Sequence, residues 1–144
     1  MSLIGISNDH GGFDLKNFII KSFPTLDFMD LGTSSSESVH YPTFADHLCK
    51  KILDGSINQG ILICGTGIGI SMRANRYPGI RAAVVHDIFT SEMAKAHNNA
   101  NIICLGGRTT SNEAAISYIE KWLSTSFESG RHQTRIDMLD EPIK

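Results

Sequence analysis

The sequence GILICGTGIGIS, residues 60–71, decides the fold that we expect of this chain. It begins with an uninterrupted apolar run, which is typical of a strand buried on both faces of a parallel sheet. Three glycines then fall within five residues, a pattern that predicts a tight turn into a helix. Such a turn can direct amide groups toward an oxyanion or a phosphate. It can equally serve only close packing of helix on strand, so the loop alone leaves both interpretations open.

Strand and helix patterns alternate on both sides of this stretch. Five apolar runs predict strands, at residues 3–6, 27–31, 61–64, 81–85 and 102–105. Helical spacing of apolar residues between the runs predicts helices, with Thr90 capping the fourth and residues 110–113 forming a capping box before the fifth. This alternation indicates an α/β fold of three layers, a parallel sheet flanked by helices.

The bulk composition fits one globular domain over residues 1–144. Thirteen basic and fifteen acidic residues leave a net charge of -2, without the basic excess of a nucleic-acid-binding protein. The apolar runs are too short to cross a bilayer, and residues 1–5 do not resemble a signal peptide. The three cysteines are widely spaced and lack a Cys-x-x-Cys pair, so we expect reduced thiols, no structural zinc and a cytoplasmic location.

Polar and reactive residues follow the predicted strands. Ligands of open α/β sheets bind outside the carboxyl ends of the strands, so these segments are the first candidates for a site. They are residues 8–12, residues 64–69, His86-Asp87 with His97-Asn98 one helix further on, and residues 106–108. We therefore expect all of them on one edge of the sheet.

Three known phosphate-binding patterns fail at this glycine loop. A dinucleotide fingerprint needs a third glycine where the chain has Ile70, although Asp87 lies near the expected acidic position. A P-loop lacks its Lys-Ser or Lys-Thr pair. A cysteine phosphatase loop would need an arginine at position 70. A nucleotide-binding module without catalysis remains as an alternative function.

Cys64 ends its strand at the start of the helix-bound loop. Helix N-termini favour the thiolate form of a cysteine, which can act as a general base or as a nucleophile. The alternative is a buried structural cysteine, and we assign Cys49 and Cys104 to that class. His10 follows Asp9, a carboxylate that can orient the imidazole. His97 ends a helix and is also a candidate, whereas the other histidines are expected to be solvated or structural, namely His40, His47, His86 and His132.

The chain ends in an arm, about residues 125–144, beyond the last core helix. If the arm is helical, Arg131 and Arg135 share one face and suit a phosphate. They could also form part of a solvated basic face. An arm with aligned arginines could reach a neighbouring subunit.

Together, these residues resemble the type B ribose-5-phosphate isomerases, in the family that also holds the galactose-6-phosphate isomerase subunits. The resemblance spans nearly the whole chain. Its motifs are Asp9-His10-Gly11-Gly12-Phe13, Gly32-Thr33 before Tyr41-Pro42, residues 60–71, His97-Asn98-Asn99-Ala100-Asn101, Gly106-Gly107-Arg108 and Gly130-Arg131-His132-Gln133-Thr134-Arg135.

The resemblance implies a Rossmann-like fold, a homodimer or tetramer with shared sites, and no metal or organic cofactor. It implies interconversion of D-ribose 5-phosphate and D-ribulose 5-phosphate through a cis-enediolate, in the non-oxidative pentose phosphate pathway. Hexose 6-phosphates, of allose or galactose, remain the alternative substrates. Some members of the family use a glutamate base where this chain has Ile70, so the chain belongs to the cysteine type.

The resemblance also implies a role for each candidate residue. Cys64 would carry the proton, and Thr66 and His97 would assist ring opening. Asp9 would bind sugar hydroxyls. The enediolate oxygen would be held by Asn98 and by the loop residues Gly65, Gly67, Ile68 and Gly69. The phosphate would be held by His10 and Arg108 of one subunit and by Arg131 and Arg135 of the other.

Overall fold

The structure is a computed structural model that describes residues 3–144. Met1 and Ser2 lie outside the described residues, and with them the start of the expected N-terminal pattern. The described chain forms, in order, β1 (Leu3–Asn8), a 3-10 turn (His10–Gly12), α1 (Phe13–Ser22), β2 (Asp27–Asp30), α2 (Tyr41–Leu53), β3 (Gly60–Cys64), α3 (Ile68–Ala74), β4 (Ala82–Val84), α4 (Ile88–Ala96), β5 (Ile102–Gly106), α5 (Asn112–Ser124) and α6 (Arg131–Asp140).

The five strands form one parallel sheet in the order β2-β1-β3-β5-β4. The central strands β3 and β5 are buried along their whole length, as their continuous apolar sequences predict. In the register of the sheet, Cys64 is paired with Gly106 at the carboxyl end of both strands. The expected α/β fold with three layers is confirmed.

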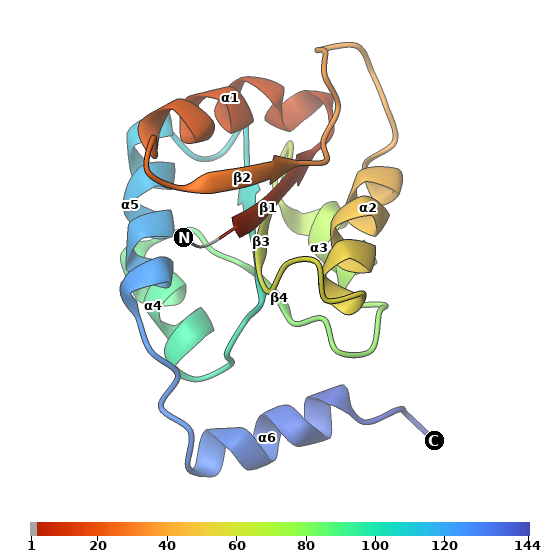
Figure 1. The fold of residues 1–144 in the computed structure, drawn as a ribbon, viewed down its shortest axis with the longest axis vertical. Helices are drawn as coiled ribbons and strands as arrows, with labels where there is room; N and C mark the ends of the chain where they lie inside the picture. The colour runs from red at the N-terminus through yellow and green to blue at the C-terminus, as the bar shows by residue number, and fades with distance from the viewer. Residues whose placement is uncertain (1–2) are drawn as a thin grey trace.

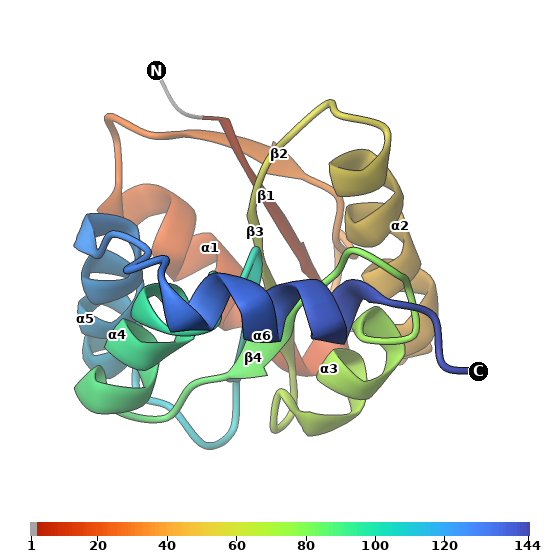
Figure 2. The same cartoon turned by 90° about the horizontal axis from the view of Figure 1, so that it is seen from below.

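Helices cover both faces of the sheet (Figures 1 and 2). On one face, α1, α4 and α5 pack around the fully buried Trp122, whose indole N–H donates to the Ala100 carbonyl at 3.2 Å. On the other face, α2 and α3 bury Leu48, Cys49 and Ile70. Among the described residues, no helix has both the length and the apolar character needed to span a membrane.

Two predicted helix caps are wrong by a few residues. Asp87, not Thr90, caps α4: its side chain accepts the Thr90 N–H, and the Thr90 hydroxyl accepts the Asp87 N–H in return. Ser111 caps α5 through the Ala114 N–H, one residue after the expected capping box begins. Asp87 is thus used in a helix cap, which removes the observation that favoured a dinucleotide.

The last helix stands apart from the body of the molecule. Figure 1 shows α6 beneath the layered body, at the end opposite the loop that joins β2 to α2. Residues 131–135 are helical, as the arginine spacing required. Arg81, just before β4, fixes the far end of α6 through a bidentate pair with Asp140 at 2.9 and 3.1 Å.

Candidate active site

Cys64 is the last residue of β3, and its side chain is 5% exposed. The backbone N–H of Gly67 donates to the Cys64 Sγ at 3.2 Å. Gly67 can turn its amide back toward the sulfur because it has a left-handed conformation, φ +79°, which favours glycine. Gly67 also caps α3, so the sulfur lies at the N-terminus of that helix. The sulfur therefore faces a backbone amide at the positive end of the helix dipole.

The other cysteines differ from Cys64 in their surroundings. Cys49 and Cys104 are 0% exposed. Burial raises the pKa of the Cys49 thiol to about 12 and raises the pKa of Cys104 well above its ordinary value. Both thiols are therefore protonated at neutral pH, and the expectation that they are buried structural cysteines is confirmed.

The loops after β1 and β5 lie against the glycine loop. The Gly107 N–H donates to the Cys64 carbonyl at 2.8 Å, and the Arg108 N–H donates to the Gly65 carbonyl at 3.0 Å. A Cβ added at Gly65 would lie 2.9 Å from the Arg108 Nη1, so the guanidinium covers this glycine. A Cβ at Gly107 would clash with the Gly11 carbonyl oxygen. The three loops therefore meet through their backbones.

Asp9 and His10 are held in place by backbone groups. The Asp9 carboxylate, 6% exposed, accepts the Gly11 N–H at 2.8 Å. The His10 Nδ1 accepts the N–H of Val39, a residue of the loop between β2 and α2, at 3.1 Å. An Nδ1 that accepts a hydrogen bond leaves the proton of a neutral imidazole on Nε2. His10 can therefore donate from Nε2 to a ligand.

Two amides of the glycine loop are already used within the loop. The Gly67 N–H points to the Cys64 sulfur, and the Ile68 N–H donates to the Thr66 hydroxyl oxygen at 3.2 Å. Thr66 is exposed at the surface of the loop. Together with Asp9, His10 and Arg108, these residues form what we call the carboxyl edge of the site.

His97 and Asn98 lie elsewhere, and the expectation of a single edge is wrong for them. They follow α4, which runs back toward the amino ends of the strands. There the Gly60 N–H, at the start of β3, donates to the carbonyl of Asn101, a few residues after His97. Cys64 is at the other end of this strand, about 13 Å away at about 3.3 Å per residue. Within one chain, His97 therefore lies at the amino-terminal edge of the sheet, and Cys64 lies at the carboxyl-terminal edge.

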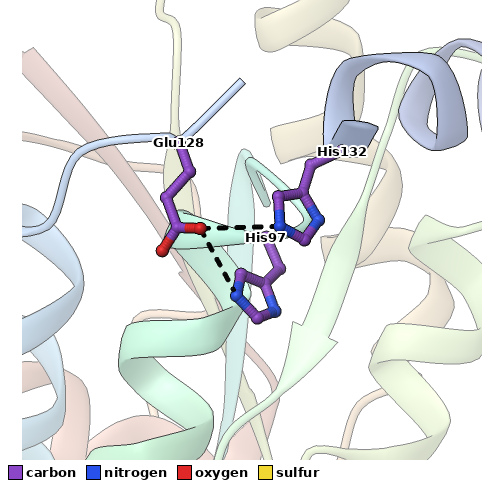
Figure 3. A group of neighbouring side chains, drawn as sticks. All are labelled: His97, Glu128 and His132. Carbon is purple, nitrogen blue, oxygen red and sulfur yellow. Dashed lines mark ion pairs between the residues drawn. The ribbon is translucent and has the colours of Figure 1, made fainter. Parts of the chain in front are cut away.

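A second group of polar residues surrounds His97, and we call it the amino edge of the site. Figure 3 shows His97, Glu128 and His132 turned toward one another. The Glu128 Oε1 lies 3.7 Å from the His97 Nε2 and 3.5 Å from the His132 Nε2. The two imidazole rings are stacked, with centroids 4.2 Å apart. The adjacent exposed side chains of Arg131 and Arg135 complete this edge.

Comparison with known proteins identifies the family. A family model described as Ribose/Galactose Isomerase matches residues 4–139. The chain belongs to this ribose/galactose isomerase family. It is 37% identical over 141 residues to ribose-5-phosphate isomerase B of Escherichia coli, an alignment that covers 96% of this chain and 95% of that protein.

Solved structures agree with this assignment to the ribose/galactose isomerase family. A ribose 5-phosphate isomerase of Thermotoga maritima has a TM-score of 0.94 and 42% identity, covering 96% of this chain and 97% of its own. The type B ribose 5-phosphate isomerase of Trypanosoma brucei has a TM-score of 0.93 and 35% identity, covering 97% of both chains. The chain is therefore an isomerase, and its Rossmann-like α/β fold is confirmed.

Sequence reasoning missed three residues of this isomerase. His132 was expected to be solvated or structural; it is buried, 6% exposed, and it stacks on the candidate residue His97, a contact that was not expected. Burial lowers the pKa of its imidazole below the ordinary value. Glu128 comes three residues before α6 begins, so no helical spacing indicated its approach to His132. The Tyr41 ring also lies beside the glycine loop, 2.7 Å from where a Cβ at Gly69 would be.

Proposed function

We propose that this chain is an aldose–ketose isomerase that interconverts D-ribose 5-phosphate and D-ribulose 5-phosphate, with Cys64 as the general base. The observation that carries the proposal is the Gly67 N–H donated to the Cys64 Sγ at the start of α3. A Cys64 thiolate accepts this hydrogen bond, as the proposed base requires. The relatives from Escherichia coli and Thermotoga maritima, which are named as ribose 5-phosphate isomerases, support the same substrate.

The reaction requires one proton to move between neighbouring carbons. The Cys64 thiolate takes the proton from C2 of the open-chain aldose, and the released electron pair forms the C1–C2 double bond of a cis-enediolate. The negative charge collects on the oxygen at C1. The proton of the C2 hydroxyl then passes to the C1 oxygen, which moves the negative charge to the C2 oxygen. As Cys64 returns its proton to C1, the C2 oxygen forms the ketone carbonyl, the C1 oxygen is left as a hydroxyl, and the thiolate is regenerated. Thr66 and His97 assist the ring opening that precedes these steps.

The carboxyl edge supplies the groups that such an intermediate needs. Backbone amides of the glycine loop other than those of Gly67 and Ile68, which bond within the loop, stabilise a developing oxyanion, because they are fixed before the reaction begins. Asp9 accepts hydrogen bonds from sugar hydroxyls. Arg108 and the Nε2–H of His10 bind the phosphate, and binding energy from this non-reacting group positions the sugar for proton transfer.

A complete site requires two copies of the chain, since its groups lie on opposite edges. In a two-fold symmetric dimer, the amino edge of each subunit meets the carboxyl edge of the other, and two identical sites result. His97, Asn98, Arg131 and Arg135 then come from the partner, through the arm at about residues 125–144. Exposed apolar side chains on α3 and α6 support such an association. They are Ile68, Met72, Met138 and Leu139.

We place the isomerase in the cytoplasm, in the non-oxidative pentose phosphate pathway. Its three cysteines are free and buried, which is in keeping with a reducing compartment. The functional residues lie in one domain, residues 1–144, and none of the proposed steps requires a metal or an organic cofactor.

The sharpest test of the proposal is Cys64→Ser. We expect the turnover number to fall by about 100-fold or more, because a positioned general base contributes about 10²–10⁴-fold. Folding and ribose 5-phosphate binding should be nearly unchanged, since serine is close in shape. Steady-state kinetics, circular dichroism and calorimetric titration measure the three quantities. Turnover close to that of the wild type would overturn the assignment of Cys64.

Two further measurements complete this test. Cys49→Ala is the matched control. It removes a thiol from the core beneath α2, so it should lower stability but leave the turnover number unchanged. A coupled assay with ribose 5-phosphate, allose 6-phosphate and galactose 6-phosphate tests the substrate. Preference for either hexose phosphate would replace the ribose assignment, while the role of Cys64 would stand.

A further inference from the structure

Three potential metal ligands converge at the amino edge. The His97 Nε2, the His132 Nε2 and the Glu128 Oε1 all lie within 4.8 Å of one another. They come from separate parts of the chain (Figure 3). His97 is at the end of α4, Glu128 is in the segment before α6, and His132 is in the first turn of α6. The Glu128 backbone N–H donates to the Ala96 carbonyl at 3.0 Å, which holds this segment against the end of α4.

The His132 Nε2 indicates that this group has a ligand. His132 is 6% exposed, and its Nε2 has no hydrogen-bond partner among the described residues. Buried polar atoms are rarely left without a partner. The Glu128 Oε1 lies 3.5 Å from this nitrogen but makes no hydrogen bond to it. A cation between the nitrogen and the carboxylate would satisfy both.

We propose that His97, Glu128 and His132 bind a zinc ion. Zinc takes imidazole nitrogen and carboxylate oxygen ligands at about 2.0–2.2 Å, which places tetrahedral ligands about 3.4 Å apart. The two histidines lie 3.5 and 3.7 Å from the Glu128 Oε1, close to this separation. Three protein ligands leave a fourth position for water.

Small side-chain movements complete the geometry. The imidazole rings are nearly parallel, 14° apart, so their lone pairs do not yet converge on one point. The His97 side chain is 37% exposed and Glu128 54%, so both can turn, whereas the buried His132 stays in place. Two nitrogen ligands favour zinc over magnesium, which prefers oxygen.

Zinc at this position inhibits the isomerase, a consequence that rests on the proposed function. A ring nitrogen that coordinates a metal has no lone pair left for proton transfer. His97 is the residue proposed to assist ring opening, so a bound ion removes it from the reaction. The ion is therefore a reversible inhibitor, not a cofactor of the reaction, and a chelator restores activity.

Calorimetric titration of the tag-free protein with zinc chloride, in a non-coordinating buffer, tests the site directly. We expect one ion per chain and no binding of magnesium chloride. His132→Gln and Glu128→Gln should each weaken binding by about 100-fold or more, since loss of an outer partner alone costs about 10–100-fold. Glu128 is exposed, so its variant keeps the fold even if His132→Gln does not.

Two controls separate this site from other zinc ligands. His86→Gln removes an exposed histidine that lies 3.6 Å from the Asp87 carboxylate, and it should bind zinc as the wild type does. Cys64→Ser removes the buried thiol of the carboxyl edge and should also keep zinc binding. Binding that persists in Glu128→Gln and His132→Gln, or that is lost in Cys64→Ser, would overturn the proposal.

An activity assay distinguishes failure of the site from failure of the function. Zinc should inhibit the wild type over the same concentration range in which it binds, and Glu128→Gln should resist. If zinc binds at the three residues without inhibition, the site stands and the assignment of His97 to ring opening falls. If zinc does not bind, the site falls and the isomerase proposal is unaffected.

Discussion

The two edges of the candidate site are built from different parts of the polypeptide. At the carboxyl edge, backbone groups dominate: loops bond directly to one another at Cys64, Gly65 and Gly107, and Cys64 is 5% exposed. At the amino edge, side chains dominate: Glu128, Arg131 and Arg135 are exposed, His97 is half-buried, and only His132 is buried.

This difference suits the separate roles that we propose for the two edges. A proton carrier and an oxyanion site gain from a fixed environment, because preorganised dipoles need no rearrangement during the reaction. Phosphate recognition by arginines tolerates movement, since long side chains can follow the ligand. In our proposal, the amino edge also contacts a second subunit, and an exposed helix such as α6 can do so.

Mixed dimers provide the strongest test of the comparison. Cys64→Ala damages only the carboxyl edge, and His97→Ala only the amino edge, so each homodimer should be inactive. After subunit exchange, we expect about a quarter of wild-type activity, because half of the dimers are mixed and each has one intact site. Exchange is verified by native mass spectrometry, and activity by the coupled assay.

The matched control combines two lesions on the same edge. Cys64→Ala mixed with Asp9→Asn should recover nothing, since every site then contains one damaged carboxyl edge. Recovery in this pair, or none in the first pair after verified exchange, would contradict the division into two edges.

The arginines of α6 are expected to give the next largest effect. Arg135→Ala should lower kcat/KM by about 10–100-fold, because a charged hydrogen bond is worth about 1.5–3 kcal/mol. The loss should appear mainly in KM and be accompanied by weaker inhibition by inorganic phosphate. The melting temperature should not change, since Arg135 is exposed. Lys21→Ala, an exposed cation on α1, is the control and should leave KM unaltered.

Gly107→Ala tests the rigid carboxyl edge without removing any reactive group. The added Cβ would clash with the Gly11 carbonyl oxygen, so the β1 and β5 loops have to separate. We expect unfolding free energy to fall by about 1–3 kcal/mol, the usual cost of overpacking. Alkylation of Cys64 by iodoacetamide should also change in rate. An equally stable variant with an unchanged alkylation rate would show that this contact does not position the thiol. The control is Gln133→Ala on α6, which should change neither the unfolding free energy nor the alkylation rate.

The smallest effect is expected at Asp46, which joins α2 to α3 behind the glycine loop. Its hydrogen bond from Arg73, at 2.8 Å, holds the pKa of this carboxyl below its ordinary value of 3.8. The stability from this pair is therefore present above about pH 4 and is lost as pH falls through the lowered pKa. Asp46→Asn should cost about 1 kcal/mol or less at pH 7, because Arg73 is exposed.

Denaturant titrations at several pH values measure this contribution. The difference between the wild type and Asp46→Asn should shrink as the pH falls below 4. A difference that is constant with pH would mean that the charge of Asp46 contributes nothing.

Much of the fold followed from local sequence patterns. Strands such as residues 61–64 and 102–105 are apolar throughout because both faces of the sheet are covered, and this pattern is visible without a structure. The position of Cys64 was equally predictable, since it comes at the junction between an apolar run and a glycine loop. The cap residues of α4 and α5 were less predictable, because several adjacent residues in each segment can cap a helix.

The single-edge expectation failed for a geometric reason. Strands of a parallel sheet share one direction, and each connecting helix runs back toward the amino ends. Residues directly after a strand therefore share an edge, whereas His97 and Asn98, after a helix, return to the other one. The contact of His97 with Glu128 and His132 could not be predicted either, since it depends on where α6 packs.

The sequence by itself thus determined the layered fold and the place of Cys64 within it, because both depend on neighbouring residues along the chain. Only the tertiary structure decided that the candidate residues form two separate groups, one on each edge of the sheet. That division depends on helix direction and on contacts between α4 and the segment that leads into α6, residues far apart in the sequence. It is also what makes a second subunit necessary for a complete site in our proposal.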